Sequence, residues 1–190
     1  MSPYENLPDT QWKKVTKKLV NEHPLSSDIL IDTVLKAWNG ILNTKIADEL
    51  QIGRDIFPTP QILGNYLHEL IPVFLEKKYP GQWTRDIEKK DKDLVCVANP
   101  YYSVEIKTSS NANNIYGNAS YGQEDSASAS SKTKDGYYLA VNFEKFNPSN
   151  KDFIPRIRKI RFGWLDHSDW HSQNASSGQA ATISPTVRDN

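Results

Sequence analysis

The sequence predicts an α/β protein with an N-terminal helical part, a central mixed sheet of four or five strands, and a helix packed on that sheet. Three observations lead to this prediction. Apolar residues recur at helical spacing up to about residue 75, short runs rich in Val, Ile, Leu and Tyr follow from residue 94, and a polar stretch separates those runs into two groups. At 190 residues, the chain has a single-domain length with room for a sizeable core.

Helical periodicity marks the first part of the chain. A helix is expected at about 9–21, and a second from a cap at 26–28 to about 43–44. A third begins at Pro60, where a missing amide donor costs no hydrogen bond. Its broad apolar stripe predicts packing against the sheet, and Pro72 should kink or divide it.

Composition limits the classes of function. The chain has 23 basic and 23 acidic residues, whereas a protein that coats nucleic acid non-specifically is expected to be basic. Neutrality still allows a basic DNA cleft beside an acidic surface. The N-terminus lacks a basic region followed by an apolar run, no membrane span is present, and the single cysteine, Cys96, lies in an apolar run. These features predict a protein of the reducing cytoplasm without an intramolecular disulfide.

The candidate site lies in two stretches, at 91–97 and 102–108, which read as apolar strands separated by an Asn-Pro break typical of a hairpin. Successive side chains of a strand point to opposite faces. Glu105 and Lys107 should therefore project together, while their neighbours enter the core. Asp93, on the other strand, can lie on the same edge. The pattern predicts two acids and an ammonium group at one spot.

These groups suit metal-assisted hydrolysis of phosphodiesters. Mg²⁺ often binds through one or two carboxylates plus waters, here Asp93 and Glu105, with the main-chain carbonyl of Ile106 as a further oxygen. Lys107 can orient the attacking water, help it to lose a proton, or stabilise charge on the phosphorane. The alternative is a solvated surface pair, because Glu-x-Lys is common on exposed strands.

Asp93 followed by Glu105-Ile106-Lys107 resembles the signature of the PD-(D/E)xK nuclease superfamily, in which the residue before the acid is often proline but is Lys92 here. Further segments resemble type II restriction endonucleases of the ScaI family, and the likeness covers most of the chain. Those segments are 51–58, 67–72, 103–111, 136–143 and 160–167. The resemblance implies a restriction endonuclease-like core and Mg²⁺-dependent, sequence-specific hydrolysis of double-stranded DNA at a short palindrome, leaving 5′-phosphate ends.

The resemblance also implies partners and a further acid. A two-fold DNA site is matched by a homodimer, with one Asp93/Glu105/Lys107 centre for each strand. A companion DNA methyltransferase would act on the same site in the bacterial cytoplasm. Many nucleases of the superfamily carry a helix acid that reaches the metal or its water, which is Glu69 in this chain. Otherwise Glu69 is a surface acid, and its neighbour His68 is expected to be structural.

The polar stretch 109–135 is either a DNA-contacting loop or a flexible linker. Its place directly after the candidate catalytic strand favours contact with DNA, because Asn and Gln amides can pair with adenine edges. The candidates are Asn111, Asn113, Asn114, Tyr116, Asn118, Tyr121 and Gln123.

Two more strands are expected, at 137–143 and 157–165. The second starts in the most basic stretch of the chain, where Arg158 and Arg161 are candidates for phosphate contact; an exposed sheet edge is the alternative. The hexapeptide 166–171 contains His and Asp, which can bind metals, but a strand-end turn that packs or contacts DNA is favoured over a zinc site. The tail 172–190 is polar and is expected to be loose without DNA.

The chain is thus expected to form one endonuclease domain, 1–190. Its parts are a helical part at 1–58, a catalytic helix and hairpin at 60–108, the polar loop at 109–135, the remaining core strands at 136–167 and a polar tail at 168–190. Two other functions remain open from the sequence. One is a structure-specific nuclease of the same fold, such as a junction resolvase or repair nuclease, and the other is a non-catalytic DNA-binding or protein-interaction domain.

Overall fold

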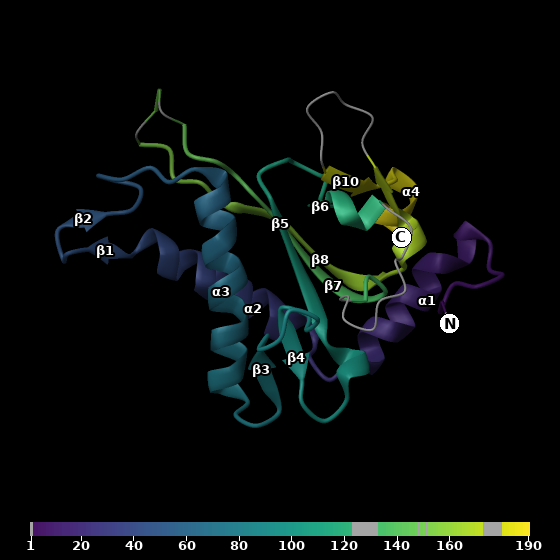
Figure 1. The fold of residues 1–190 in the computed structure, drawn as a ribbon. Helices are drawn as coiled ribbons and strands as arrows, with labels where there is room; N and C mark the ends of the chain where they lie inside the picture. Colours follow the sequence, from purple (N-terminus) through teal and green to yellow (C-terminus); the bar gives the residue numbers. More distant parts are fainter. Residues whose placement is uncertain (1, 123–132, 148, 151, 173–179) are drawn as a thin grey trace.

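The computed structural model describes residues 2–122, 133–147, 149–150, 152–172 and 180–190. Its centre is a mixed sheet of five strands in the order β3-β4-β5-β7-β8 (Figure 1). β5 and β7 run parallel, and the other neighbours are antiparallel. The strands are β3 (Trp83–Arg85), β4 (Leu94–Cys96), β5 (Val104–Ser109), β7 (Gly136–Phe143) and β8 (Ile157–Leu165). The predicted α/β class and mixed sheet are confirmed.

Three long helices cover one face of this sheet. They are α1 (Asp9–Glu22), α2 (Ser27–Leu42) and α3 (Pro60–Lys78). α3 packs on β3 and β5, while α1 and α2 contact β8. Pro60 occupies the first turn of α3 as predicted, but Pro72 does not divide the helix. A fully buried stripe on α3 spans this proline and holds both halves against the sheet; it comprises Leu63, Leu67, Ile71 and Leu75.

The other face carries a smaller sheet, in the order β6-β10-β9, beside the short helix α4 (Figure 1). These elements are β6 (Tyr116–Asn118), β9 (Trp170–Ser172), β10 (Ala180–Ile183) and α4 (Pro185–Asp189). They lie in segments that the sequence predicted as a polar loop and a loose tail. β6 is only three residues long, and it forms a strand because β10 pairs with it from more than sixty residues further along the chain.

The remaining elements are short. β1 (Lys45–Ile46) and β2 (Leu50–Gln51) form a separate two-stranded sheet, and three 3₁₀ turns complete the described structure. The turns are η1 (Pro100–Tyr102), η2 (Ala119–Gly122) and η3 (His167–Asp169). Of these, η1 joins β4 to β5, and η2 follows β6 directly, so both turns lie next to the strand that carries the candidate site.

β7 is buried along its whole length because it separates two apolar cores. Alternate side chains of a strand point to opposite faces. One set packs with the helices, and the other set packs under the small sheet. The first set is Tyr137, Leu139, Val141 and Phe143, and the second includes Tyr138 and Ala140. β5, next to β7, is therefore also enclosed from both sides.

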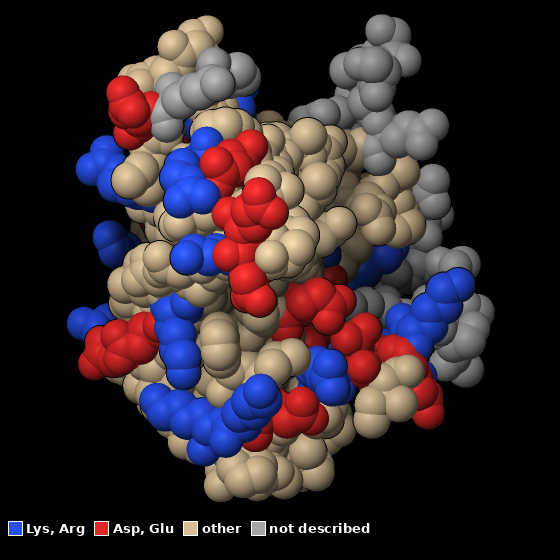
Figure 2. All heavy atoms as spheres, turned by 90° about the vertical axis from the view of Figure 1, so that its left-hand side faces the viewer, with Lys and Arg blue, Asp and Glu red and all other residues tan. Residues whose placement is uncertain are grey.

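The charged residues are mixed rather than segregated on the face that Figure 2 shows, which is the left-hand side of Figure 1, and acidic and basic side chains lie side by side there. This arrangement agrees with the zero net charge of the sequence. Among the described residues, no helix is long and apolar enough to cross a membrane.

α3 approaches β5 closely at Gly64. A Cβ atom added there would lie 2.6 Å from Oγ1 of Thr108 on β5, which is shorter than any ordinary contact. Thr108 is β-branched and therefore stiff about χ1, so it cannot swing away cheaply. The absence of a side chain at residue 64 thus sets how near the helix lies to the strand.

We predict that Gly64→Ala lowers the free energy of unfolding by about 1–3 kcal/mol through overpacking, measured by urea denaturation. Gly40→Ala is the matched control, because Gly40 is exposed in α2 and an added Cβ meets nothing within 4 Å. It should stabilise the protein by about 0.5–1 kcal/mol. Adding Thr108→Ala to Gly64→Ala should recover part of the loss. Equal effects of the two glycine substitutions would contradict the close approach.

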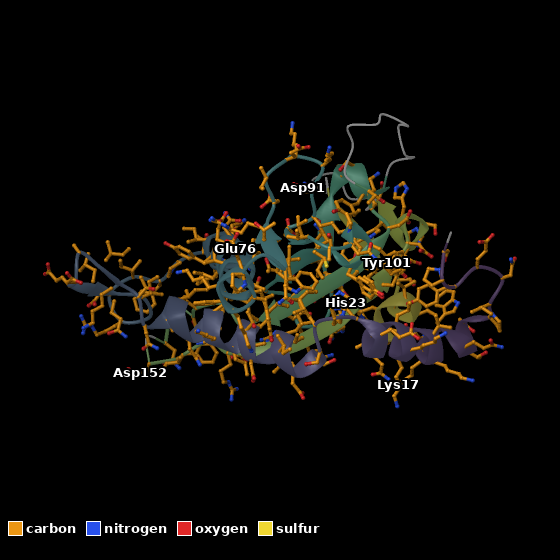
Figure 3. The ribbon with its side chains drawn as sticks, turned by 90° about the horizontal axis from the view of Figure 1, so that it is seen from below. Lys17, His23, Glu76, Asp91, Tyr101 and Asp152 are labelled. Carbon is orange, nitrogen blue, oxygen red and sulfur yellow. The ribbon has the colours of Figure 1, made fainter. Side chains whose placement is uncertain are left out.

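His23 lies in the interior, between α1 and the sheet (Figure 3). Its Nε2 donates to the carbonyl of Tyr102 at 3.0 Å, and its Nδ1 accepts from the amide of Leu25 at 3.1 Å. The rings of Tyr137 and Phe162 lie 4.5 and 4.8 Å away. One donor and one acceptor require the neutral imidazole, and burial accordingly lowers the pKa of His23 below its usual 6.5.

We predict that His23 makes stability depend on pH. Because its pKa is lower in the folded state, the unfolded chain binds a proton first as the pH falls below about 6.5. The stabilisation is complete above that pH and is lost as the pH falls through the folded-state pKa. Urea denaturation at several pH values should therefore show a weaker acid dependence for His23→Gln than for the wild type. His171→Gln, at an exposed histidine, is the control for the substitution itself, and equal effects of the two variants would contradict a specific role of His23.

Candidate active site

The hairpin of β4 and β5 places Asp93 against the middle of β5. β4 has only three residues, and Leu94 with Val104 is the one pair in register between the two strands. Beyond that pair, the amide of Ile106 donates to Oδ2 of Asp93 at 2.6 Å instead of to a strand carbonyl. The Asp93 carboxylate is thus fixed beside the backbone that lies between Glu105 and Lys107.

Glu105 and Lys107 form an ion pair on one face of β5, with Nζ and Oε1 2.6 Å apart. Their side chains are only 4% and 13% exposed, respectively. Val104 and Ile106 point to the opposite face and are fully buried in the core under the helices. The alternation predicted from the sequence is confirmed, and the burial rules out a solvated surface pair.

Tyr121, on η2, completes the surroundings of this pair. Its hydroxyl donates to Oε1 of Glu105 at 2.8 Å, and Nζ of Lys107 lies 4.6 Å from the centre of its ring. Burial, reinforced by the nearby Glu105 carboxylate, raises the pKa of Tyr121 far above its usual range, so the phenol stays protonated. Because Tyr121 is only 7% exposed, its hydroxyl faces the active centre and not the DNA bases that the sequence suggested.

Sequence reasoning missed this placement of Tyr121 because the surrounding stretch is polar. The apolar cover comes from Ile115 and from distant residues of β9 and β10, such as Trp170 and Ala181. A local signal does exist. A Cβ on Gly117 would lie 2.8 Å from Cγ of Tyr121, so an aromatic residue closely flanked by glycines marks tight packing within an otherwise polar segment.

On α3, the structure brings His68 and not Glu69 to the site. Nδ1 of His68 lies 3.6 Å from Oδ2 of Asp93. His68 follows Gly64 by four residues and so shares its sheet-facing side of the helix. Glu69 is exposed on the neighbouring face. Helical phase was the signal that could have separated these two adjacent residues.

The donor set suits Mg²⁺. Within the described part of the chain, no three His, Cys, Asp or Glu side chains come together as a metal site, so Glu69 is not assembled with Asp93 and Glu105. The carboxylates of Asp93 and Glu105 could hold a hard divalent cation, with the Ile106 carbonyl as a further oxygen and the remaining positions open to water.

The hexapeptide 166–171 has a structural role in the chain as described. Asp166 and Asp169 form a capping box around η3, in which each carboxylate accepts from the other residue's backbone amide. Trp170 then packs into the core under the small sheet. This confirms a packed strand-end turn.

The candidate DNA-contacting residues lie around a turn at 111–114. Oδ1 of Asn111 accepts from the amides of residues 113 and 114 at 3.0 and 2.9 Å. The fully buried Asn142 donates to the carbonyls of residues 111 and 114 at 2.9 and 3.0 Å. Arg161 donates to Oδ1 of Asn142 at 2.8 Å. Arg161 therefore supports the turn indirectly, because it binds the Asn142 side chain that donates to the turn carbonyls.

The other candidates differ in exposure. Asn111, Asn113 and Asn118 are exposed, whereas Asn114 and Tyr116 are half-buried. Oδ1 of Asn113 accepts from Lys159, and that of Asn114 accepts from Arg188. Arg158 is exposed with Nε 3.7 Å from Oε1 of Glu144. Gln123 lies outside the described residues.

We predict that Asn142→Leu lowers the free energy of unfolding by about 1–3 kcal/mol, because two carbonyls and Arg161 lose a buried partner. Hydrogen exchange of the amides at 111–116 should also become faster. Asn43→Leu is the control, since Asn43 is an exposed residue at the end of α2, and it should change stability by less than about 0.5 kcal/mol. Unchanged exchange at 111–116 would show that the turn does not depend on Asn142.

Comparison with known proteins identifies the class of the chain. Type II restriction enzyme ScaI of Streptomyces caespitosus is 44% identical over 186 residues, which are 98% of this chain and 81% of that protein. The class is therefore that of the type II restriction enzymes. The ScaI restriction endonuclease family matches residues 2–190, and the chain belongs to this family. No solved structure matches the chain significantly.

Proposed function

We propose that the chain hydrolyses double-stranded DNA at a short palindromic site, using Mg²⁺ held by Asp93 and Glu105. The observation that carries this proposal is the buried Glu105–Lys107 pair beside Asp93 on β5. Membership of the ScaI restriction endonuclease family supports it. The mixed sheet would then be a PD-(D/E)xK core, and residues 1–190 would act as one endonuclease domain.

The mechanism follows from the side chains on β5. Asp93, Glu105 and the Ile106 carbonyl would hold Mg²⁺, which when bound would neutralise charge on the phosphate and lower the pKa of water. Lys107, which otherwise donates to Glu105, orients the attacking water and stabilises the negative charge that develops on the phosphorane. In-line attack expels the 3′ oxygen and leaves a 5′ phosphate. The enclosed site strengthens each of these electrostatic interactions.

DNA recognition would use the polar end of β5. A hollow of about 660 Å³ lies there, between the start of α3 and the segment that follows β5. Its lining includes Gln61, Asn65, Ser110, Asn111 and Tyr116. Amide groups of this kind can pair bidentately with adenine. The nearby exposed side chains of Asn113, Asn118 and Arg158 would add base or phosphate contacts.

A palindromic site implies a two-fold assembly. Two copies of the chain, related by the symmetry of the DNA, would present one active centre to each strand. A methyltransferase that modifies the same site would protect the host DNA, as the family implies. Both partners are part of the proposal.

We predict that the purified protein cuts plasmid and phage DNA into discrete fragments in Mg²⁺, and that EDTA abolishes cutting. Lys107→Ala should reduce the cleavage rate by about 10²- to 10⁴-fold while a gel-shift assay in EDTA shows unchanged DNA binding. Lys17→Ala is the control, because Lys17 lies on the outer side of α1 and points away from the molecule (Figure 3). It should cleave like the wild type.

Other results would point to the two rival functions. A smear or intact linear DNA together with cleavage of branched substrates would replace the site-specific function with a structure-specific one. Binding without cleavage of any substrate, equal in the wild type and Lys107→Ala, would leave a non-catalytic DNA-binding protein. Cleavage by Lys107→Ala at the wild-type rate would remove Lys107 from the active centre.

A further inference from the structure

We propose that Tyr121 is a positioning residue of the active centre, whose hydroxyl orients Glu105 and whose ring holds Lys107. This inference rests on the proposed function, because it assigns Tyr121 a part in the same site. Tyr121 comes from η2, outside the five-stranded sheet that carries the two charged residues.

One oxygen atom receives two donors. Oε1 of Glu105 accepts from the Tyr121 hydroxyl at 2.8 Å and from Nζ of Lys107 at 2.6 Å. Two hydrogen bonds on one carboxylate oxygen, both charge-assisted because the acceptor is ionised, fix the rotation and the direction of the carboxylate. The hydroxyl therefore sets the orientation in which Glu105 meets a metal ion.

The ring of Tyr121 gives Lys107 a second partner. Nζ lies 4.6 Å from the centre of the ring, within the range of a cation–π interaction. A metal ion bound by the Glu105 carboxylate would weaken the attraction between Glu105 and Lys107. The ring still attracts the ammonium group, so Lys107 remains beside the phosphate that is to be attacked.

Packing keeps Tyr121 itself in place. The ring of Trp170 lies 4.8 Å from that of Tyr121 in an edge arrangement, and Gly117 leaves only enough room for the ring. In metal sites, residues that do not bind the metal themselves often donate hydrogen bonds to the ligands and fix their orientation. A rigid Tyr121 outside the sheet can act on Glu105 in this way.

Two substitutions separate the two contacts. Tyr121→Phe removes the hydroxyl and keeps the ring, whereas Tyr121→Leu removes both. Tyr137→Phe is the matched control, because Tyr137 is also a buried tyrosine, but its hydroxyl donates to the carbonyl of Leu19 under the helices. All variants are made in the full chain and compared by thermal unfolding.

The experiment measures binding of Mn²⁺ by electron paramagnetic resonance, single-turnover cleavage of duplex DNA in Mg²⁺, and DNA binding in EDTA. For Tyr121→Phe we expect Mn²⁺ affinity to fall roughly 10- to 100-fold, while metal-free DNA binding stays at the wild-type level. Tyr121→Leu should in addition slow single-turnover cleavage at saturating metal, because Lys107 loses its ring. Tyr137→Phe should change none of the three measurements.

The proposal is overturned if Tyr121→Phe binds Mn²⁺ and cleaves like the wild type. It is also overturned if Tyr121→Phe loses metal-free DNA binding, or if its lower Mn²⁺ affinity is matched by Tyr137→Phe, since either result indicates a general structural role. Failure of the proposed function is a different result, in which the wild type binds Mn²⁺ but cleaves no DNA. In that case a loss of Mn²⁺ affinity in Tyr121→Phe alone would still support the placement of Tyr121.

Discussion

The structure depends on keeping a carboxylate buried on β5. Removing the Glu105 charge from water is costly unless hydrogen bonds and an opposite charge compensate for it. Lys107 supplies the charge and Tyr121 a second donor, both on the same oxygen. Each of these groups needs an apolar layer behind it, which the small sheet provides. Because Lys107 belongs to the five-stranded sheet and Tyr121 to the turn η2 beside the small sheet, the buried acid joins the two layers of the protein.

The geometry of the centre also depends on where a strand ends. β4 stops pairing with β5 after one residue pair, and the side chain of Asp93 takes the place of the missing strand carbonyl. A longer β4 would satisfy the amide of Ile106 and leave the carboxylate elsewhere. On the other side of the hairpin, the close approach at Gly64 places His68 near Asp93. The short pairing of β4 with β5 thus frees the Asp93 side chain, and the missing side chain at Gly64 lets His68 lie near it.

The sequence predicts the parts of this arrangement that depend on local rules. Strand alternation placed Glu105 and Lys107 together, and the first turn of α3 was recognised from Pro60. What it could not provide was long-range pairing. The small sheet joins segments more than sixty residues apart, so Tyr121 was taken for an exposed loop residue. The choice between His68 and Glu69 required the exact rotation of α3, and a family likeness to other nucleases pointed to the acid.

The small sheet has a consequence for the order in which the centre can form during synthesis. β6 and Tyr121 emerge from the ribosome well before β9 and β10, which supply their partner strand and their apolar cover. Contacts between segments so far apart form late, because the loop between them must close first. A nascent chain that ends before β9 therefore carries Glu105, Lys107 and Tyr121 without the later apolar residues that keep Tyr121 in place. For a protein that cuts DNA, catalytic geometry would be withheld until the last strand is made.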